Sequence, residues 1–306
     1  MDFSFWPTTA QPWPDLLRGC RWAEANGWHG VWVPDHFMTN VPVGTVADEE
    51  LAPWLESWTT QAALAALVPR VRIGAMVSGN LYRHPAVVAN MAATIDEISG
   101  GRCVVGLGAG WQENEHARYG FDLVTAASRS DKLEEACAVI RGLLDSSRTT
   151  FAGVHYRLDA APCEPSGVAG RIPLLVGGKG ERRTLRTVAR FADEWNMWAF
   201  PDEIGPKRDV IARWCEEIGR DPAEIRVTVS AMARICESAA EATRVRERLG
   251  NHGGLVGASA DEVAAAVGAY AEAGVDEIVL ADFNLPVARR EEILDQFQAE
   301  VVERSR

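Results

Sequence analysis

The chain has 306 residues, of which 47% are hydrophobic and 24% are charged, a balance that supplies a large core and excludes an intrinsically disordered protein. Its 31 Lys and Arg against 43 Asp and Glu give a formal net charge of −12. This charge argues against a surface for nucleic acid or for an anionic membrane, since both need a basic footprint. Any anionic ligand must therefore meet a local basic patch.

The N-terminus carries no basic segment before an apolar run, and no apolar stretch reaches the roughly 18 residues of a membrane span. The six cysteines include no CxxC pair and are widely spaced, which predicts reduced, partly buried thiols rather than disulfides. We therefore expect a soluble, cytoplasmic protein.

Short apolar runs alternate along the chain with longer stretches of helical periodicity. Acidic residues near the start and glycine after the end mark these stretches as helices, and strands separated by helices indicate parallel βαβ units. The eight runs predicted as strands are 3–6, 30–33, 71–77, 103–107, 172–176, 194–197, 225–229 and 277–281. The predicted helices include 15–26, 86–98, 131–144, 181–191, 203–218 and 261–273.

A weak internal repeat favours one closed architecture. Residues 23–35 and 271–282 each contain a helix end, a glycine, a short apolar strand and an Asp at the strand's C-terminal end. Eight strands fit an α/β fold of the (β/α)8 TIM-barrel type better than the alternative, an open doubly wound sheet. Segments 34–57 and 146–171 read as insertions at the C-terminal face, and the second contains an alternating run that predicts a small hairpin. We expect a single domain over residues 1–306.

A glycine-rich segment runs from the fifth predicted strand directly into a helix. Gly177, Gly178, Lys179 and Gly180 fill it, and Arg183 follows. Glycine lets the backbone approach a ligand closely, and the free N–H groups of a helix start favour an anion, so the segment is a candidate phosphate cradle. Positions 179–190 hold five basic residues; a solvent-exposed helix face explains the later ones, whereas Lys179 and Arg183 are candidate ligands.

A second glycine cluster follows the fourth predicted strand. It contains Gly108, Ala109 and Gly110, and Trp111 occupies the place where a dinucleotide fingerprint has its third glycine. One interpretation is a tight barrel turn. The other is a flat surface for a ring system, with the polar residues at 112–115 at its edge.

The end of the second predicted strand carries Asp35 and His36. The pKa of histidine lies near neutrality, so His36 is a candidate general acid or base, and a hydrogen-bonded structural histidine is the alternative. The six histidines show no HxH or HExxH spacing, which makes a metal site unexpected. Trp6, Trp111 and Trp198 lie at strand ends, where they either wall a pocket for a planar cofactor or pack at the rim.

Four blocks together resemble the luciferase-like monooxygenase superfamily, specifically the oxidoreductases that use the deazaflavin coenzyme F420. The blocks are VWVPDHF at 31–37, RIGAMVSGNLYRHPAVVANMAATIDEISGGR at 72–102, VVGLGAGWQENEHARYGF at 104–121 and IPLLVGGKGERRTLRTVARFADEWN at 172–196. They occur in this order, and the resemblance covers nearly the whole chain. The resemblance implies a TIM barrel with a coenzyme site at its C-terminal face, and a homodimer.

The resemblance also implies roles for individual residues. Asp35 and His36 match a pair that faces the reactive edge of the deazaflavin, and the bond between Ala75 and Met76 matches a non-proline cis peptide behind the ring. Some members that oxidise a sugar phosphate carry a catalytic Glu where this chain has Trp111, so that activity is not implied; Glu113 or Glu115 is a candidate replacement. The positions matching coenzyme contacts are Gly108, Ala109, Gly110 and Asn114, and those matching the phosphate cradle are Gly177, Gly178, Gly180 and Arg183.

We therefore expect an F420-dependent oxidoreductase that transfers a hydride between C5 of the deazaflavin and a small organic substrate. His36 is expected to exchange the accompanying proton, and Asp35 to orient the coenzyme or the histidine. The first alternative is an FMN-dependent monooxygenase that uses O2, because both coenzymes offer a phosphate to the cradle. The second is a protein that binds a coenzyme without turnover.

Overall fold

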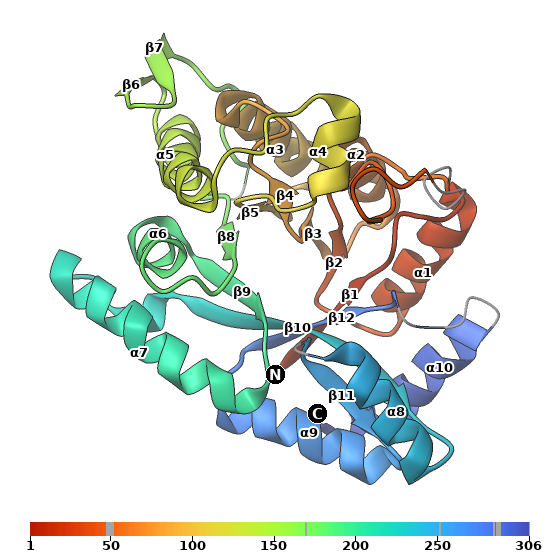
Figure 1. Ribbon diagram of the computed structural model, residues 1–306. Helices are drawn as coiled ribbons and strands as arrows, with labels where there is room; N and C mark the ends of the chain where they lie inside the picture. The colour runs from red at the N-terminus through yellow and green to blue at the C-terminus, as the bar shows by residue number, and fades with distance from the viewer. Residues whose placement is uncertain (47–51, 169, 251, 284, 286–288, 306) are drawn as a thin grey trace.

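The computed structural model describes residues 1–46, 52–168, 170–250, 252–283, 285 and 289–305. Eight parallel strands pair in the order β1-β2-β3-β5-β8-β9-β10-β12, and β12 pairs with β1 to close a barrel with helices around it (Figure 1). The fold is the (β/α)8 barrel predicted from the sequence. The barrel strands are β1 (Asp2–Trp6), β2 (Gly30–Val33), β3 (Arg72–Ala75), β5 (Cys103–Gly108), β8 (Leu174–Gly177), β9 (Glu194–Trp198), β10 (Arg226–Ile235) and β12 (Glu277–Ala281).

Ten α-helices are assigned in the described part of the chain. All six predicted helices are present, but the one expected at 181–191 begins only at Thr184, because residues 181–183 form a turn. The helices are α1 (Trp13–Ala25), α2 (Ser57–Leu67), α3 (Pro85–Ser99), α4 (Glu113–Tyr119), α5 (Ala126–Asp145), α6 (Thr184–Phe191), α7 (Pro201–Ile218), α8 (Ala239–Leu249), α9 (Ala260–Glu272) and α10 (Arg290–Phe297). None of them, over the residues described, is long and apolar enough to cross a bilayer.

The remaining strands depart from a minimal barrel. β6 (Thr149–Ala152) and β7 (Arg157–Ala161) form the antiparallel hairpin expected in the 146–171 insertion. β10 runs six residues beyond its predicted end at 229, because its C-terminal part pairs with β11 (Gly254–Gly257). Most of the 34–57 insertion is irregular, and its residues 47–51 lie outside the described part of the chain.

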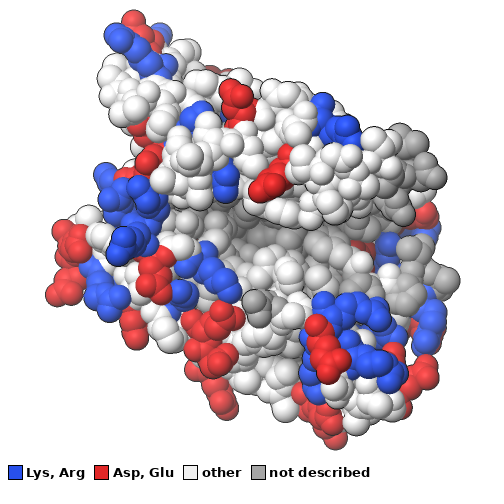
Figure 2. All heavy atoms as spheres, viewed as in Figure 1, with Lys and Arg blue, Asp and Glu red and all other residues white. Residues whose placement is uncertain are grey.

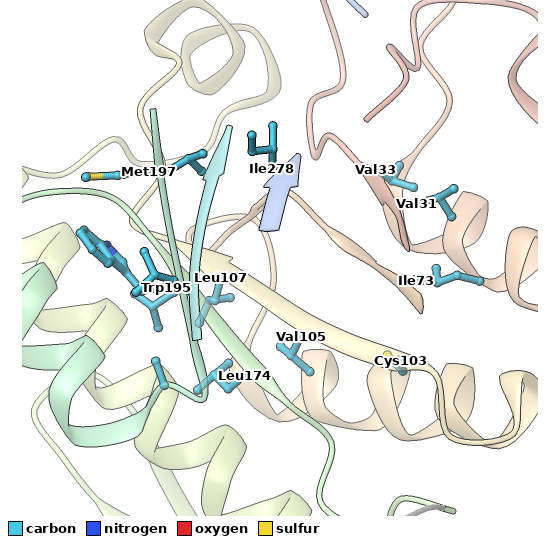
Figure 3. Close-up of a cluster of buried hydrophobic side chains, with 14 of the residues drawn as sticks. Val31, Val33, Ile73, Cys103, Val105, Leu107, Leu174, Trp195, Met197 and Ile278 are labelled. Atoms are coloured by element: carbon cyan, nitrogen blue, oxygen red, sulfur yellow. The ribbon is translucent and has the colours of Figure 1, made fainter. Parts of the chain in front are cut away.

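Alternation along the strands sorts their side chains into two layers. Val31 and Val33 point out toward the helices, as do the alternate residues of β5 and β8 that Figure 3 labels. The residues between them, such as Trp32 and Val104, belong to a separate cluster inside the barrel. This period of two is the ordinary consequence of a pleated strand, and it makes the barrel interior a packed core rather than a pore.

A charged network closes the N-terminal end of the barrel. The Arg72 guanidinium pairs with Glu194 and lies 3.6 Å from Glu277, and Arg226 lies 3.3 Å from the same Glu277 carboxylate. Glu277 is fully buried and also accepts a hydrogen bond from the Trp32 indole at 3.3 Å. Removing one partner of this buried network would leave an uncompensated charge and destabilise the barrel. The chemistry of such barrels takes place at the opposite, C-terminal end.

The six cysteines are free thiols and all are buried, as the absence of paired spacing predicted.

Candidate active site

The sequence motifs come together at the C-terminal end of the barrel. Asp35 and His36 follow β2, Met76 follows β3, Gly108 ends β5 and Gly177 ends β8. Because β2, β3, β5 and β8 are parallel neighbours in the sheet, these chain segments lie side by side on one face.

Asp35 is a buried anchor for the chain that follows β3. Its Oδ2 accepts hydrogen bonds from the Ser78 hydroxyl at 2.7 Å and from the Gly79 N–H at 3.0 Å. Arg83 adds a bidentate pair, at 2.7 Å to Oδ2 and 3.1 Å to Oδ1. The carboxylate is thus fully engaged within the protein, and no hydrogen bond of the described residues joins it to His36.

The segment that Asp35 holds is a bulge between β3 and β4 (Ser78–Gly79). It contains a non-proline cis peptide, as the resemblance implied, but the bond joins Met76 to Val77 and not Ala75 to Met76. The expected position is therefore wrong by one residue. Ala75 and Met76 are both buried.

The bulge explains why glycine occupies three positions in the neighbouring strands β5 and β8. A Cβ at Gly108 would lie 2.5 Å from Val77 Cγ2, and one at Gly177 would lie 3.0 Å from both γ-methyl groups of Val77. A Cβ at Gly106 would collide with the backbone oxygen of Ala75. These glycines therefore admit the bulge into the barrel mouth, a reason of packing that neither earlier interpretation contained.

His36 is held by a glutamate from α4. Its Nδ1 lies 3.0 Å from Glu115 Oε2, and the Glu115 side chain is fully buried whereas the His36 side chain is 22% exposed. Burial, together with the nearby Glu115 carboxylate, raises the pKa of the Tyr82 hydroxyl. Glu113, the predicted catalytic glutamate, is exposed. The structure thus brings Glu115 to His36 in place of Glu113.

The start of α4 fastens the loop that carries His36. The Gln112 side-chain amide donates to the Met38 carbonyl at 3.0 Å, and the Asn114 amide donates to the Thr39 carbonyl at 2.9 Å. Asn114, a predicted coenzyme contact, is therefore buried and partly committed to this loop, although its Oδ1 has no hydrogen-bond partner among the described residues. Gly110 precedes this helix with φ +82°, a conformation that favours glycine.

Aromatic rings gather at two places on the rim. Trp111 and Trp54 stand edge-on to the His36 imidazole, with ring centroids at 5.5 and 6.1 Å. The other predicted wall residues, Trp6 and Trp198, pack against each other at 5.5 Å on the β1 and β9 side of the barrel. Trp111 therefore belongs with His36, and Trp6 and Trp198 form a separate contact.

A buried carboxylate ends β12 on the same face. Asp282 Oδ1 accepts the Thr8 N–H at 2.7 Å, and its Oδ2 lies 3.2 Å from the Arg290 Nε. Burial raises the pKa of Asp282 to about 6, although Arg290 and the Thr8 N–H act in the opposite direction. Asp282 thus connects the loop after β1 to the end of β12. Its burial makes the charged form of the carboxylate less favourable than it is in water.

The predicted phosphate cradle is a hollow at the start of α6. Gly178 has φ +126°, and a Cβ there or at Gly180 would press on the Thr184 side chain, so the loop folds tightly over the first residue of the helix. No side chain caps the helix N-terminus. The hollow has a volume of about 450 Å³ and is lined by Ala126, Ala127, Ser130, Lys179, Gly180, Glu181, Arg182, Arg183, Thr184 and Lys207.

Four cations line this hollow, and exposed carboxylates hold three of them. Lys179 pairs with Glu203 at 3.0 Å, Lys207 with Glu181 at 2.6 Å, and Arg183 with Asp131 at 3.0 Å. The fourth cation, Arg182, is exposed and makes no ion pair within the described residues. Exposed ion pairs of this kind contribute only about 0–1 kcal/mol to stability, so a bound anion can replace the carboxylates as the partner of these cations.

The later basic residues of the segment are structural. A solvent-exposed helix face was predicted for Arg186 and Arg190; Arg190 is exposed and Arg186 is partly buried, and both pair with Glu134 of α5, which the prediction did not include. Lys and Arg gather over α6 and the adjoining part of α7, next to a hollow near the middle of this face (Figure 2). Sequence reasoning missed Lys207 and Ser130, because neither lies near the glycine motif in the chain.

The donor set of the cradle fits a phosphate group. The start of α6 has no side-chain cap, so its backbone N–H groups can donate to a phosphate. A Cβ at Gly178 or Gly180 would press on Thr184, and the cations that line the hollow are only weakly paired. Both F420 and FMN carry such a phosphate. The cradle is therefore suited to either coenzyme.

Comparison with known proteins agrees with this geometry. The family model for luciferase-like monooxygenases matches residues 1–253. The chain belongs to the luciferase-like monooxygenase family. It is 27% identical over 234 residues to an uncharacterised protein of Mycobacterium tuberculosis, a match that covers 64% of this chain and 81% of that protein.

Two further relatives of this luciferase-like chain carry different activities in their names. The pyrimidine monooxygenase of Allorhizobium ampelinum is 37% identical over 141 residues, which are 45% of this chain and 38% of that protein. Among solved structures, an F420-dependent secondary alcohol dehydrogenase bound to an F420-acetone adduct has a TM-score of 0.83 and 22% identity, covering 100% of this chain and 99% of that one. At this identity the structural likeness shows the fold, and members of the luciferase-like family are oxidoreductases that include monooxygenases.

Proposed function

We propose that the protein is an F420-dependent oxidoreductase that transfers a hydride between C5 of the deazaflavin and a small organic substrate. The observation that carries this proposal is a histidine, held by a buried carboxylate, on the same barrel face as a basic hollow suited to phosphate. The fold that the chain shares with the F420-dependent alcohol dehydrogenase supports it. A bound deazaflavin would supply the redox chemistry, and the chain's own residues would supply position and a proton.

His36 is the residue that exchanges the proton. Glu115 lies 3.0 Å from His36 Nδ1 and accepts its N–H, which leaves Nε2 as the nitrogen that gives a proton to the substrate or takes one from it. Glu115 therefore positions the His36 ring and selects which ring nitrogen carries the proton. We assign this part to Glu115 rather than to Glu113, which is exposed.

Asp35 acts through the bulge. Its hydrogen bonds with Ser78, Gly79 and Arg83 fix the segment at 76–79. Met76 in this segment, and Ala75 at the end of β3 just before it, would back the coenzyme ring. The remaining coenzyme contacts that we propose are the chain around the ring at Gly108, Ala109, Gly110 and Asn114, and the phosphate cradle at Gly177, Gly178, Lys179, Gly180, Arg182, Arg183 and Lys207.

The alternative is an FMN-dependent monooxygenase that uses O2. Its specific support is the similarity to the pyrimidine monooxygenase over 141 residues. The cradle does not separate the two coenzymes. The cluster of cations around it favours F420, because the oligoglutamate tail of F420 adds carboxylates to the phosphate.

Anaerobic turnover with F420 tests the proposal against the alternative. We expect a panel of ketones, enones and secondary alcohols to contain a substrate that changes the oxidation state of F420 without O2. His36→Ala should lower kcat about a hundredfold or more while the coenzyme Kd stays within about twofold, and the exposed Glu113→Gln should match the wild type. Consumption of O2 with reduced FMN and no turnover of F420 would establish the alternative instead.

We also propose a homodimer. An apolar hollow of about 500 Å³ lies between α2 and α3 on the outside of the barrel, lined by Trp58, Thr59, Ala62, Ala86, Val87, Asn90, Met91, Thr94 and Ile95. Val87 is 51% exposed, and Ile98, about three turns further along the same face of α3, is 45% exposed, so apolar side chains extend beyond the hollow along this face. Light scattering on the purified protein should give twice the 33.3 kDa chain mass, and a single chain mass would contradict the proposal.

A further inference from the structure

Trp111 is an exposed aromatic side chain beside the candidate acid-base residue. It is 56% exposed and stands in the turn between β5 and α4. Its ring centroid lies 5.5 Å from that of His36, with the planes at 79°. A large indole left in water next to a functional group is more typical of a binding surface than of packing.

The Trp54 ring also packs edge-on against the His36 imidazole. Its ring centroid lies 6.1 Å from that of His36 with the planes at 84°, and its indole N–H donates to the Thr39 hydroxyl at 3.2 Å. We call Trp54, Trp111 and His36 the aromatic wall. The wall combines two rigid apolar rings with one group that can exchange a proton.

The loop that carries His36 is held in place by α4. Glu115 holds His36, and the two residues on either side of Glu113 anchor the same loop through the Met38 and Thr39 carbonyls. Rigid aromatic side chains lose little conformational entropy on binding, so a wall held in this way binds a flat group efficiently.

Among the described residues, the cation next to Asp35 is already paired and is not available to an anionic substrate at the wall. Arg83, the cation beside Asp35, is held by both Asp35 and Glu56. The buried Glu115 carboxylate adds negative charge behind His36. The cations of the phosphate cradle, Lys179, Arg182, Arg183 and Lys207, lie at the start of α6 and in α7, on elements other than those that carry the wall.

We propose that the aromatic wall is the substrate-recognition site and that it takes an uncharged, planar aromatic or conjugated ring bearing a carbonyl or hydroxyl group within reach of His36. Trp111 is the specificity-determining residue of this site. The proposal deepens the proposed function and rests on it for the role of His36, whereas the preference for a flat uncharged ring is measured by binding alone.

Two ketones of matched size and one charged analogue isolate the contributions. Acetophenone carries a planar ring, cyclohexyl methyl ketone has the same carbon skeleton saturated and puckered, and 4-acetylbenzoate adds a carboxylate to the planar ring. Their Kd values are measured by titration calorimetry on wild-type protein, both alone and loaded with whichever of F420 and FMN it binds. We expect acetophenone to bind at least about tenfold more tightly than either of the other two.

Variants at the wall give the second measurement. Trp111→Ala should weaken acetophenone binding about tenfold to a hundredfold and leave cyclohexyl methyl ketone within about threefold, whereas Trp111→Phe should restore most of the loss. Val154→Ala is the control, because Val154 is 89% exposed in the turn between β6 and β7, outside the site. Thermal unfolding of each variant verifies that it is folded.

The outcomes separate the two proposals. Equal Kd values for acetophenone and cyclohexyl methyl ketone, failure of acetophenone to bind, or unchanged binding to Trp111→Ala would each overturn the recognition site. If neither coenzyme binds but the ring preference and its loss in Trp111→Ala are observed, the proposed function fails and the recognition site stands.

Discussion

A double substitution at the bulge tests why β5 ends in a glycine, Gly108. A Cβ at Gly108 would lie 2.5 Å from Val77 Cγ2, whereas carbon atoms in contact lie about 3.5–4.0 Å apart, so Gly108→Ala requires a movement of about 1 Å or more. The neighbouring chain resists it, because the Met76 N–H bonds to the Val33 carbonyl and Asp35 holds Ser78. Overpacking of this kind lowers the free energy of unfolding by about 1–3 kcal/mol.

Val77→Ala removes the two methyl groups that cause the clash. Alone it should lower the free energy of unfolding by about 1–2 kcal/mol, because the side chain is partly buried. Combined with Gly108→Ala it should give a protein about as stable as Val77→Ala, so the coupling energy between the two sites is about 1–3 kcal/mol. Urea unfolding followed by far-UV circular dichroism measures all four proteins.

Gly106→Ala is the matched control for this cycle. Its Cβ would collide with the Ala75 backbone oxygen, which Val77→Ala leaves in place, so the double variant should be no better than the sum of its parts. Additive effects of Gly108→Ala and Val77→Ala, or a neutral Gly108→Ala, would refute the packing explanation for these glycines.

Three further predictions concern charged groups. Glu115→Gln should lower kcat about tenfold and shift the pH profile, since an amide still accepts from His36 Nδ1 but without a charge; an unchanged profile contradicts the positioning role. Burial raises the pKa of Asp282 to about 6 from 3.8, so stability relative to Asp282→Asn should fall by about 1.4 kcal/mol between pH 5 and 7.5, as the pH rises through the folded pKa; a difference independent of pH contradicts this. Arg182→Ala should weaken coenzyme binding about tenfold, and Arg190→Ala, whose cation Glu134 holds, should leave it within twofold; equal effects contradict the cradle geometry.

The barrel could be predicted because its signals are local. Each of the eight apolar runs carries its own hydrophobic pattern, and the alternation within Val31, Trp32 and Val33 sorts side chains between the barrel interior and the helices without reference to the rest of the chain. The end of β10 was missed for the opposite reason. Its last six residues are a strand because β11 pairs with most of them, and that partner lies about twenty residues downstream.

The candidate glutamate could not be chosen from the sequence. Glu113 and Glu115 are two positions apart at the start of α4, and two residues of a helix are separated by about 200° around its axis. Only one of them can therefore face His36. Which one does so depends on the rotation of α4 about its axis, and this is set by packing and by anchors such as Gln112 on the Met38 carbonyl.

The ion-pair partner of Asp35 could not be predicted from the sequence either. Arg83 lies 48 residues along the chain from Asp35, and no short motif joins the two. The resemblance placed Asp35 at the end of β2, where the structure has it, and implied a role at the coenzyme. In the structure the Asp35 carboxylate accepts hydrogen bonds from Ser78, Gly79 and Arg83. Polar pairing across the barrel mouth is a tertiary property that neither spacing nor composition encodes.

Equilibrium titration of the coenzyme-free protein with F420 and with FMN tests the central claim most directly. Each titration is followed by calorimetry under identical salt, because the cradle binds through charge and salt weakens such binding. The account predicts that F420 binds with a micromolar or lower Kd and at least about tenfold more tightly than FMN. Micromolar binding of FMN with no detectable binding of F420 would contradict it.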